Sequence, residues 1–348
     1  MNSFYSGAYT SDGFKSYKLK SVSPDCFRYI LKGESPTVKE KLFKNIIAML
    51  DKDNADYTIS RNYDNRITGV HCSKKGFIIC DGTYPFCEEA STFGAVDGII
   101  STEIFQNSKA LRRCADDILE MNAQVLCNER RCVRFLSAAA GLAEDKKRLE
   151  KDIIDTIKIG RYAAKLWHNY GCSPSGKVGV EKQVFLSVPT KDGVKCSDAD
   201  LSQLCDTAIV INDPIGTSAD IIADRIRRYA LSSGVDIISC CSFLNPGDDP
   251  EHVINPSLRF GVFKFSKELK LNIPNIKKVK ASRFASKELV ENIRVRLQFN
   301  QRAYDSLMKE VTETIKNIDN MRQRIDVIYS QATDEYAFNN SVISRVFS

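Results

Sequence analysis

The pattern of apolar and polar residues predicts a strand, a loop and a helix near the start of the chain. Residues 27–31 form a β-like apolar run, and residues 41–50 form a helix-like run. Between them lies the polar loop 32–40, and a further β-like run follows at 76–80. Strands that alternate with helices in this way are typical of an α/β fold.

The loop 32–40 matches part of the phosphate-binding pattern G-x-x-x-x-G-K-[ST]. That pattern needs bare backbone N–H groups to wrap the phosphates, a lysine that reaches the β- and γ-oxygens, and a hydroxyl that holds Mg²⁺. Gly33 and Lys39 stand in register with it, whereas Val38 replaces the second glycine and Glu40 replaces the hydroxyl. The candidate nucleotide-contacting residues are Gly33, Thr37, Lys39 and Glu40.

An acidic residue at the end of the run 76–80 completes the candidate site. Asp81 is the expected Mg²⁺ ligand, because a carboxylate at a strand end can hold the water shell of the metal against the phosphates. Val38 is β-branched and poorly suited to positive φ, so it should change the shape of the loop or block close approach of phosphate. Glu34 and Glu40 add negative charge, and Glu40 could itself satisfy the free N–H groups at the start of the helix. The loop is therefore either a weakened nucleotide site or a self-filled one.

Four residues near the start recur at an offset of 180, which predicts an internal duplication. They are Thr10, Asp12, Gly13 and Lys15, repeated as Thr190, Asp192, Gly193 and Lys195. At a similar offset, the loop 32–40 corresponds to a second strand, loop and helix within 209–231, and the run 76–80 corresponds to 259–263.

The second loop has lost more of the phosphate-binding pattern than the first. Asp213 stands in place of Gly33, and Ala219 stands in place of Lys39. Lys264 lies near the position where the metal-binding acid is expected. No Mg-assisted phosphoryl transfer is therefore expected in the second half.

Each copy leads into a long helical arm that begins Ser-Lys-x-Leu, at Ser108 and at Ser286. In the second arm, 286–334, the apolar residues recur at steps of three and four: Tyr304, Met308, Val311, Ile315, Ile318, Met321, Ile325 and Ile328. The first arm, 108–170, has a similar stripe: Leu111, Cys114, Ile118, Leu119, Leu126, Ile153, Ile154 and Ile157. A turn is expected near Gly141, so we expect helical hairpins that pack on their own partner helices or on the other arm.

A segment containing Gly, Ser and Pro at 171–182 lies between the two copies and is the expected linker. The predicted domains are therefore 1–172, with its arm at 108–170, and 173–348, with its arm at 286–334. The length of 348 residues is sufficient for two cores.

Composition and charge add three expectations. The chain has no run of about 18 apolar residues and no apolar signal-peptide core in residues 1–20, so we expect a cytoplasmic protein without a membrane span. The twelve cysteines form no C-x-x-C pair, which favours reduced thiols over a metal site. The net charge of +6 is concentrated in 264–302, which holds eleven Lys and Arg against three Asp and Glu, with Phe284 and Phe299 among them. That segment is either a surface for a nucleic acid or another anionic partner or simply a solvated face.

The order of these features resembles a family of uncharacterised tandem P-loop ATPases of spore-forming bacteria. The resemblance covers Thr-x-Asp-Gly at 10–13, the strand and loop at 29–33, Asp-Gly-Thr at 81–83, Gly-Ala-Val-Asp at 94–97 and the arm from Ser108. It implies two P-loop NTPase-like domains, each with a mainly parallel sheet, flanking helices and a long helical arm. It also implies ATP and Mg²⁺ as ligands and ATPase activity, from which this chain departs at Val38 and Glu40. The alternative is a pseudo-ATPase that serves as an interaction scaffold. Its arms would then bind a protein partner or a second copy of the chain.

Overall fold

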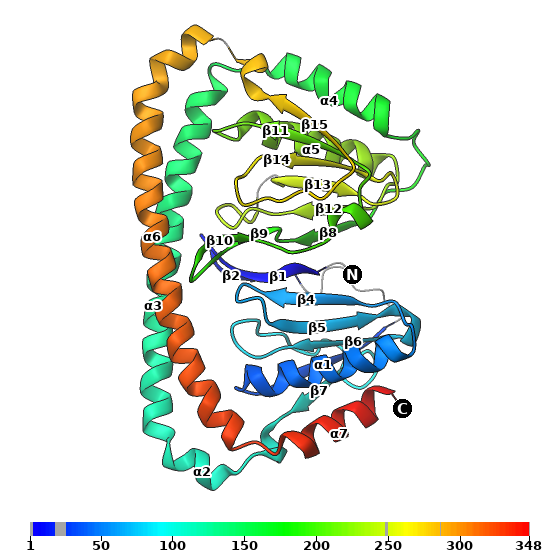
Figure 1. The fold of residues 1–348 in the computed structure, drawn as a ribbon, viewed down its shortest axis with the longest axis vertical. Helices are drawn as coiled ribbons and strands as arrows, with labels where there is room; N and C mark the ends of the chain where they lie inside the picture. The colour runs from blue at the N-terminus through cyan, green and yellow to red at the C-terminus, as the bar shows by residue number, and fades with distance from the viewer. Residues whose placement is uncertain (1–2, 18–25, 248–249, 286, 348) are drawn as a thin grey trace.

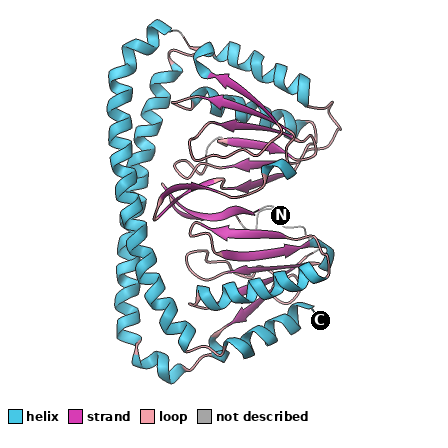
Figure 2. Ribbon diagram, viewed as in Figure 1, coloured by secondary structure: helices cyan, strands magenta, loops and turns pink. Residues whose placement is uncertain are grey.

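The computed structural model describes residues 3–17, 26–247, 250–285 and 287–347. Two β-sheets lie one above the other along a pair of long helices, and shorter helices cover the sheets (Figure 1). Figure 2 shows the strands gathered inside this frame of helices. The fold is therefore mixed α/β, as the sequence predicts.

The first half contains a seven-stranded sheet in the order β2-β1-β4-β5-β6-β3-β7. Its strands are β1 (Ser3–Thr10), β2 (Gly13–Ser16), β3 (Phe27–Lys32), β4 (Thr58–Asn62), β5 (Ile67–Cys72), β6 (Phe77–Asp81) and β7 (Asp97–Ser101). Helix α1 (Pro36–Lys52) follows β3 and buries Leu42, Phe43 and Ile46, which recur at helical spacing. Strand β3 pairs in parallel with β6 and β7, whereas β4, β5 and β6 form an antiparallel meander.

The second half repeats this arrangement. Its sheet has the order β15-β11-β14-β13-β12-β8, which corresponds to β7-β3-β6-β5-β4-β1. The strands are β8 (Glu181–Val184), β11 (Thr207–Asn212), β12 (Ile237–Cys240), β13 (His252–Asn255), β14 (Phe260–Lys264) and β15 (Asn275–Lys280), and β9 (Ser187–Thr190) and β10 (Gly193–Cys196) form a separate hairpin. Helix α5 (Thr217–Ser232) corresponds to α1. The sheets were expected to be mainly parallel. Pairing is parallel beside each loop, between β1 and β4 and between β8 and β12, but it is antiparallel in the meanders.

The two hairpins that open the halves have the same hydrogen bonds. The Thr10 hydroxyl donates to the Gly13 carbonyl oxygen at 2.6 Å and accepts from the Asp12 N–H at 3.2 Å. In the hairpin at 190–193 the equivalent bonds measure 2.7 and 3.1 Å. The duplication predicted from the sequence is thus confirmed in the strand order and in the turn geometry.

The two halves meet at the residue pair Tyr5 and Phe185, which are themselves 180 positions apart. The Tyr5 N–H donates to the Phe185 carbonyl oxygen at 3.2 Å, and the Phe185 N–H donates to the Tyr5 carbonyl oxygen at 3.0 Å. A pair formed by equivalent residues of antiparallel segments lies on a two-fold axis. The chain therefore folds as an internal pseudo-dimer.

Each arm crosses from its own half to the other half. Helix α3 (Ala115–Lys151), preceded by α2 (Ser108–Arg113), leads into α4 (Thr156–Tyr170), which packs on α5. Helix α6 (Lys287–Gln331) lies against α3 and leads into α7 (Glu335–Phe347), which joins the apolar cluster of α1. The predicted stripe of α6 is confirmed, since Val311, Ile315, Ile318 and Ile325 are buried between the arms and the two hairpins.

Two expectations about the arms are wrong. Helix α3 continues through Gly141, because one glycine costs only about 1 kcal/mol in a helix and α3 packs along the length of α6. The break comes instead at 152–155, so the first arm is not a hairpin. Leu119 and Leu126 were expected in the apolar stripe, yet their side chains are 67% and 43% exposed. Ser286, the expected start of the second arm, lies outside the described residues.

Candidate functional site

The loop between β3 and α1 starts a well-capped helix. The Ser35 hydroxyl accepts from the Val38 N–H at 3.3 Å as the N-cap, and Pro36 occupies the first turn, where no N–H is needed. Gly33 has a φ of 156°, and a Cβ atom there would collide with the Thr102 side chain. Val38 packs its side chain into the core below the loop and is 1% exposed. These contacts fix the positions of Gly33, Ser35 and Val38 at the start of α1.

Lys39 is buried at the base of the loop and has three oxygen partners. Its Nζ lies 2.7 Å from the Gly33 carbonyl oxygen, 2.8 Å from Asp81 Oδ1 and 2.9 Å from Thr83 Oγ1. The parallel pairing of β3 with β6 brings the loop and Asp81 to the same sheet edge. The structure thus brings together three of the predicted residues, Gly33, Lys39 and Asp81. A lysine ammonium has three donors, so all of them are used inside the protein.

The start of α1 holds the carboxylate of Asp326, which comes from α6 in the arm of the second half. Asp326 Oδ1 accepts from the Ser35 hydroxyl at 2.6 Å and from the Thr37 N–H at 3.2 Å, while Oδ2 accepts from the Thr37 hydroxyl at 2.5 Å. The N-terminus of a helix offers free N–H groups and a positive dipole end, which together bind anions. An internal carboxylate therefore stands where a phosphate group would stand.

Two predicted contacts have different roles from those expected. Thr37 binds Asp326 through both its N–H and its hydroxyl. Glu40 turns away from the loop and pairs with Lys44 at 3.0 Å, one turn along the helix. The prediction that Glu40 fills the loop is wrong, because a side chain in the second turn already has a cation within reach. Sequence reasoning missed Asp326, which lies 291 positions from Ser35 and carries no local signal.

The second loop is also filled by carboxylates. Asp213 Oδ1 accepts from the Gly216 N–H at 2.9 Å, and Oδ2 accepts from the Ala219 N–H at 2.9 Å. The Thr217 N–H at the start of α5 donates to Glu150 Oε2 at 3.1 Å, and Glu150 belongs to α3 in the arm of the first half. Burial and the neighbouring Asp213 raise the pKa of Glu150 to about 7. Each arm therefore supplies a carboxylate to the helix start of the other half.

The buried lysine and acid exchange places between the halves. In the first half the lysine is on the helix and the acid, Asp81, ends the strand. In the second half Asp220 is on the helix, and Lys264 ends β14 with its Nζ 3.6 Å from Asp220 Oδ1. Burial alone would lower the pKa of Lys264, but the carboxylates of Asp220 and Glu251 raise it above its usual range. The second half thus retains an ion pair, but its lysine and acid stand in the reverse order to that of a phosphate-binding site.

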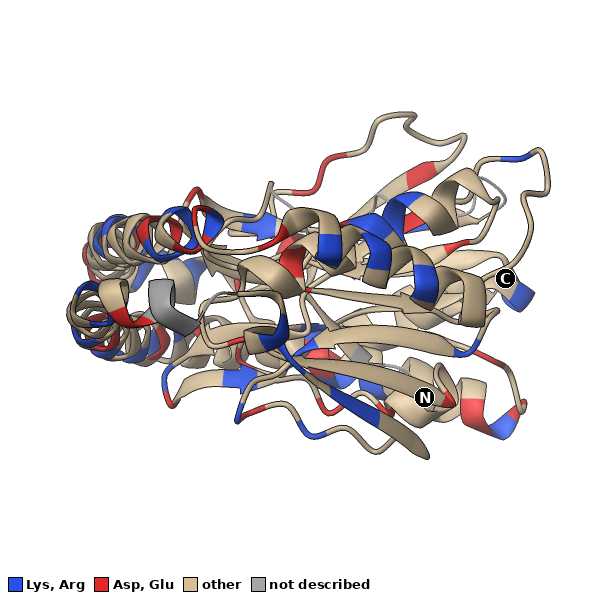
Figure 3. Cartoon of the chain, turned by 90° about the horizontal axis from the view of Figure 1, so that it is seen from above, with Lys and Arg blue, Asp and Glu red and all other residues tan. Residues whose placement is uncertain are grey.

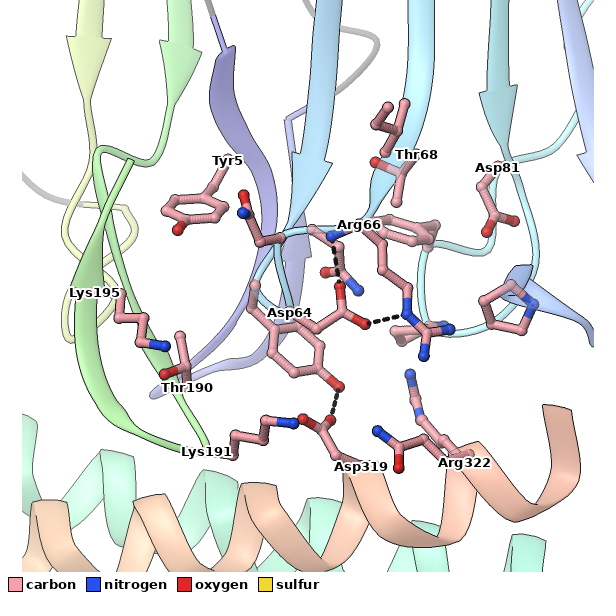
Figure 4. Close-up of a pocket in the computed structure, with 18 of the residues that line it drawn as sticks. Tyr5, Asp64, Arg66, Thr68, Asp81, Thr190, Lys191, Lys195, Asp319 and Arg322 are labelled. Carbon is pink, nitrogen blue, oxygen red and sulfur yellow. Dashed lines mark hydrogen bonds and ion pairs between the residues drawn. The ribbon is translucent and has the colours of Figure 1, made fainter. Parts of the chain in front are cut away.

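A cavity of 1180 Å³ opens in front of the first loop, between the two halves. Gly33, Lys39, Asp81 and Thr83 line one end of it. The β9–β10 hairpin of the second half lines the other end, and α6 forms part of the wall (Figure 4). The predicted site therefore lies at the edge of a larger space that both halves enclose.

The basic residues of 264–302 do not form one surface. Lys264 is half-buried and paired with Asp220 and Glu251, whereas Lys277, Lys278 and Lys280 are exposed on the edge strand β15. Figure 3 looks onto this end of the molecule, where basic positions lie along both the strand and the neighbouring helix. Phe284 is 2% exposed and cannot stack on a base, while Phe299 is 67% exposed. Lysines on an edge strand also keep sheets from pairing with one another, which is a sufficient reason for them here.

Other observations concern the described part of the chain as a whole. None of its helices combines the length and apolar character that a membrane crossing requires. No group of three or more His, Cys, Asp or Glu side chains is placed to hold a metal ion in the described ranges. The twelve cysteines are free thiols, and seven of them are buried. Comparison with known proteins gives no match to a family model, to a curated protein or to a solved structure.

Proposed function

We propose that this chain is a pseudo-ATPase with two tandem P-loop-type halves, in which internal carboxylates replace phosphate, and that it serves as a scaffold. The observation that carries the proposal is the Asp326 carboxylate on the Ser35 hydroxyl, the Thr37 N–H and the Thr37 hydroxyl. Support also comes from the second half, where Glu150 binds the start of α5 in the same manner. A carboxylate from the opposite arm at both helix starts favours a retained feature of the architecture over a chance contact.

The residues of the first loop do not fit ATP and Mg²⁺ as they stand. Lys39 uses its three donors on Gly33, Asp81 and Thr83, so none is left for a phosphate oxygen. Asp81 Oδ1 accepts from both Lys39 Nζ and the Thr83 N–H, and Glu40 supplies no hydroxyl for the metal. We therefore derive no hydrolytic step through this site.

The crossed arms hold the two halves of the scaffold together. The buried residues Ile159, Ala163 and Leu166 of α4 belong to the core of the second half, and Phe338 and Val342 of α7 belong to that of the first. Because each carboxylate is carried by the arm of the opposite half, separating the halves would uncover both helix starts. The exposed Leu119 and Leu126 lie one heptad apart on α3, with Leu126 at the wall of the cavity, and offer a protein partner an apolar contact.

Calorimetry with Mg-ATP tests the proposal. The wild-type chain should give no binding heat at millimolar nucleotide and no phosphate release. The variant Val38→Gly, Glu40→Thr, Asp326→Asn restores the glycine and the hydroxyl and neutralises the internal anion, so it should gain nucleotide binding that the wild type lacks. Val38→Gly, Glu40→Thr alone is the matched control and should bind less, since Asp326 still fills the helix start. Hydrolysis by the wild type would remove the proposal.

A nucleotide-binding protein is the second candidate function. The observation that favours it is the 1180 Å³ cavity, which reaches Gly33, Lys39 and Asp81 and exceeds the usual range of about 300–1000 Å³ for ligand pockets. Binding would require Asp326 to leave the start of α1 and Lys39 to exchange one protein oxygen for a phosphate oxygen. Saturable Mg-ATP binding by the wild type that is lost in Lys39→Met would support this candidate over the scaffold.

A further inference from the structure

Five charged side chains from three parts of the chain meet in the middle of the cavity. Asp64 and Arg66 lie on the turn between β4 and β5, Asp319 and Arg322 lie on α6, and Lys191 lies on the β9–β10 hairpin of the second half. Figure 4 shows these side chains pointing into one space, with the guanidinium groups of Arg66 and Arg322 directed toward each other. This cluster touches the filled helix start only through Arg66, whose Nη1 lies 3.4 Å from Asp326 Oδ2.

The internal partners of the two arginines leave much of their hydrogen-bonding capacity unused. Arg66 lies 3.4 Å from Asp64 Oδ2 through Nε and 3.4 Å from Asp326 Oδ2 through Nη1, both longer than the usual 2.7–3.2 Å of a good hydrogen bond. Arg322 donates from Nη2 to Glu129 Oε1 at 2.5 Å. A guanidinium group carries five N–H donors in a planar fork that matches phosphate or carboxylate oxygens. If the two arginines had a purely structural role, we would expect protein acceptors for most of their guanidinium N–H groups.

Glu129 is too firmly held to be the intended partner of both arginines. It accepts from the Tyr9 hydroxyl at 2.7 Å and from the Tyr84 hydroxyl, in addition to Arg322. Asp326 is likewise held by Ser35 and Thr37. Two guanidinium groups that face each other repel, and the long 3.4 Å contacts of Arg66 with Asp64 and Asp326 and the hydrogen bond from Arg322 to Glu129 offset only part of this repulsion. The space between Arg66 and Arg322 therefore favours an oxyanion.

The opposite wall of the cluster offers acceptors. Asp319 accepts from the Tyr63 hydroxyl at 3.0 Å, and burial together with the charge of Asp64 raises the pKa of Asp319 to about 6. Two carboxylates beside the arginines disfavour a ligand that carries only negative charge. They favour one with hydroxyl or ammonium donors next to its oxyanion, because such donors can bind Asp64 and Asp319 while the oxyanion binds the arginines.

We propose that this cavity binds a small hydroxylated oxyanion, a phosphate monoester or a hydroxy acid, between Arg66 and Arg322. Lys191 closes the site from the second half, so the ligand contacts both halves and the arm. The proposal does not require nucleotide binding at the loop, since the ligand would contact neither Lys39 nor the N–H groups at the start of α1.

Calorimetry with glycerol 3-phosphate, citrate, inorganic phosphate and glycerol tests the proposal on the full chain. We expect binding of glycerol 3-phosphate or citrate, weaker binding of inorganic phosphate and none of glycerol, with affinity falling as salt rises. The phosphate and hydroxy-acid probes distinguish the two sources of the oxyanion. Failure of both at millimolar concentration would overturn the proposal, as would equal binding of glycerol.

Variants of Arg66 and Lys191 locate the site and leave Arg322, the partner of Glu129, in place. Arg66→Gln and Lys191→Gln should each weaken binding about tenfold, and Arg66→Lys should weaken it less because the charge remains without the fork. Arg131→Gln changes the same charge on the outside of α3, where Arg131 pairs with Glu310, and should bind as the wild type does. Unchanged binding in Arg66→Gln, or equal loss in Arg131→Gln, would contradict the site. Hydrogen exchange should independently slow at residues 62–68 on ligand addition.

Discussion

Replacing Asp326 by alanine tests how far an internal carboxylate stabilises the start of α1. The change removes two hydrogen bonds to Ser35 and Thr37 hydroxyls and one to the Thr37 N–H. At about 1 kcal/mol net for each bond these amount to about 3 kcal/mol. The favourable interaction of an anion with the helix dipole adds about 1 kcal/mol. We therefore expect Asp326→Ala to lower the free energy of unfolding by about 4 kcal/mol, and Asp326→Asn by about half of that, since one acceptor oxygen remains.

Guanidinium chloride unfolding, followed by circular dichroism at equal ionic strength, measures this cost. The matched control is Glu313→Ala, which removes an exposed acid from the same helix and should change stability by less than about 0.5 kcal/mol. A second readout comes from sulfate, which should raise the thermal midpoint of Asp326→Ala more than that of the wild type by occupying the vacated helix start. A cost below about 1 kcal/mol, or equal stabilisation of both proteins by sulfate, would refute the reasoning.

Three further predictions concern the ion pair, the second half and the arms. Lys39→Met should cost about 3–5 kcal/mol in chemical unfolding because Asp81 stays buried without its cation, and adding Asp81→Asn should recover part of that loss. The raised pKa of Glu150 means that the folded state binds its proton more tightly than the unfolded state, whose pKa is near 4.5. The contribution of Glu150 to the free energy of unfolding should therefore be complete below about pH 4.5. It should fall by about 3 kcal/mol as pH rises from there through 7. Urea unfolding at a series of pH values measures this slope, which Glu150→Gln should abolish. Residues 171–180 form no helix or strand, so a protease can cleave the chain there. The two fragments should still elute together, at the volume of the intact chain, because each arm stays packed in the other half. Separation of the fragments on gel filtration would contradict the crossed arrangement.

Local patterns were sufficient to predict the elements around the loop. The run at 27–31, the helix after the loop and the apolar stripe of α6 all correspond to observed elements, because each depends on periodicity within a few turns or strand residues. The repeat at offset 180 also held, since turn residues such as Asp12 and Gly13 act through their own backbone. Lys39 and Asp81 were expected in the same site, as ligands of phosphate and of Mg²⁺, but their direct ion pair was not expected.

The filling of the loops could not be predicted in the same way. Asp326 and Glu150 are single polar residues on long amphipathic helices, where an acid usually indicates a solvated position. Their role depends on the arms crossing to the opposite half, which no local pattern encodes. The expected turn at Gly141 concealed this crossing, because a hairpin would have returned the first arm to its own half. Glu40 was a candidate to fill the loop because it lies near the start of the helix, but its side chain pairs with Lys44 instead.

A crystal structure of the wild-type chain grown with Mg-ATP in millimolar excess tests the central claim most directly. We expect the Asp326 carboxylate to stay between the Ser35 and Thr37 hydroxyls and Lys39 Nζ to stay on Gly33, Asp81 and Thr83, with no phosphate at the start of α1. A phosphate group bound to the Thr37 N–H, with Asp326 displaced and Lys39 turned toward it, would contradict the account.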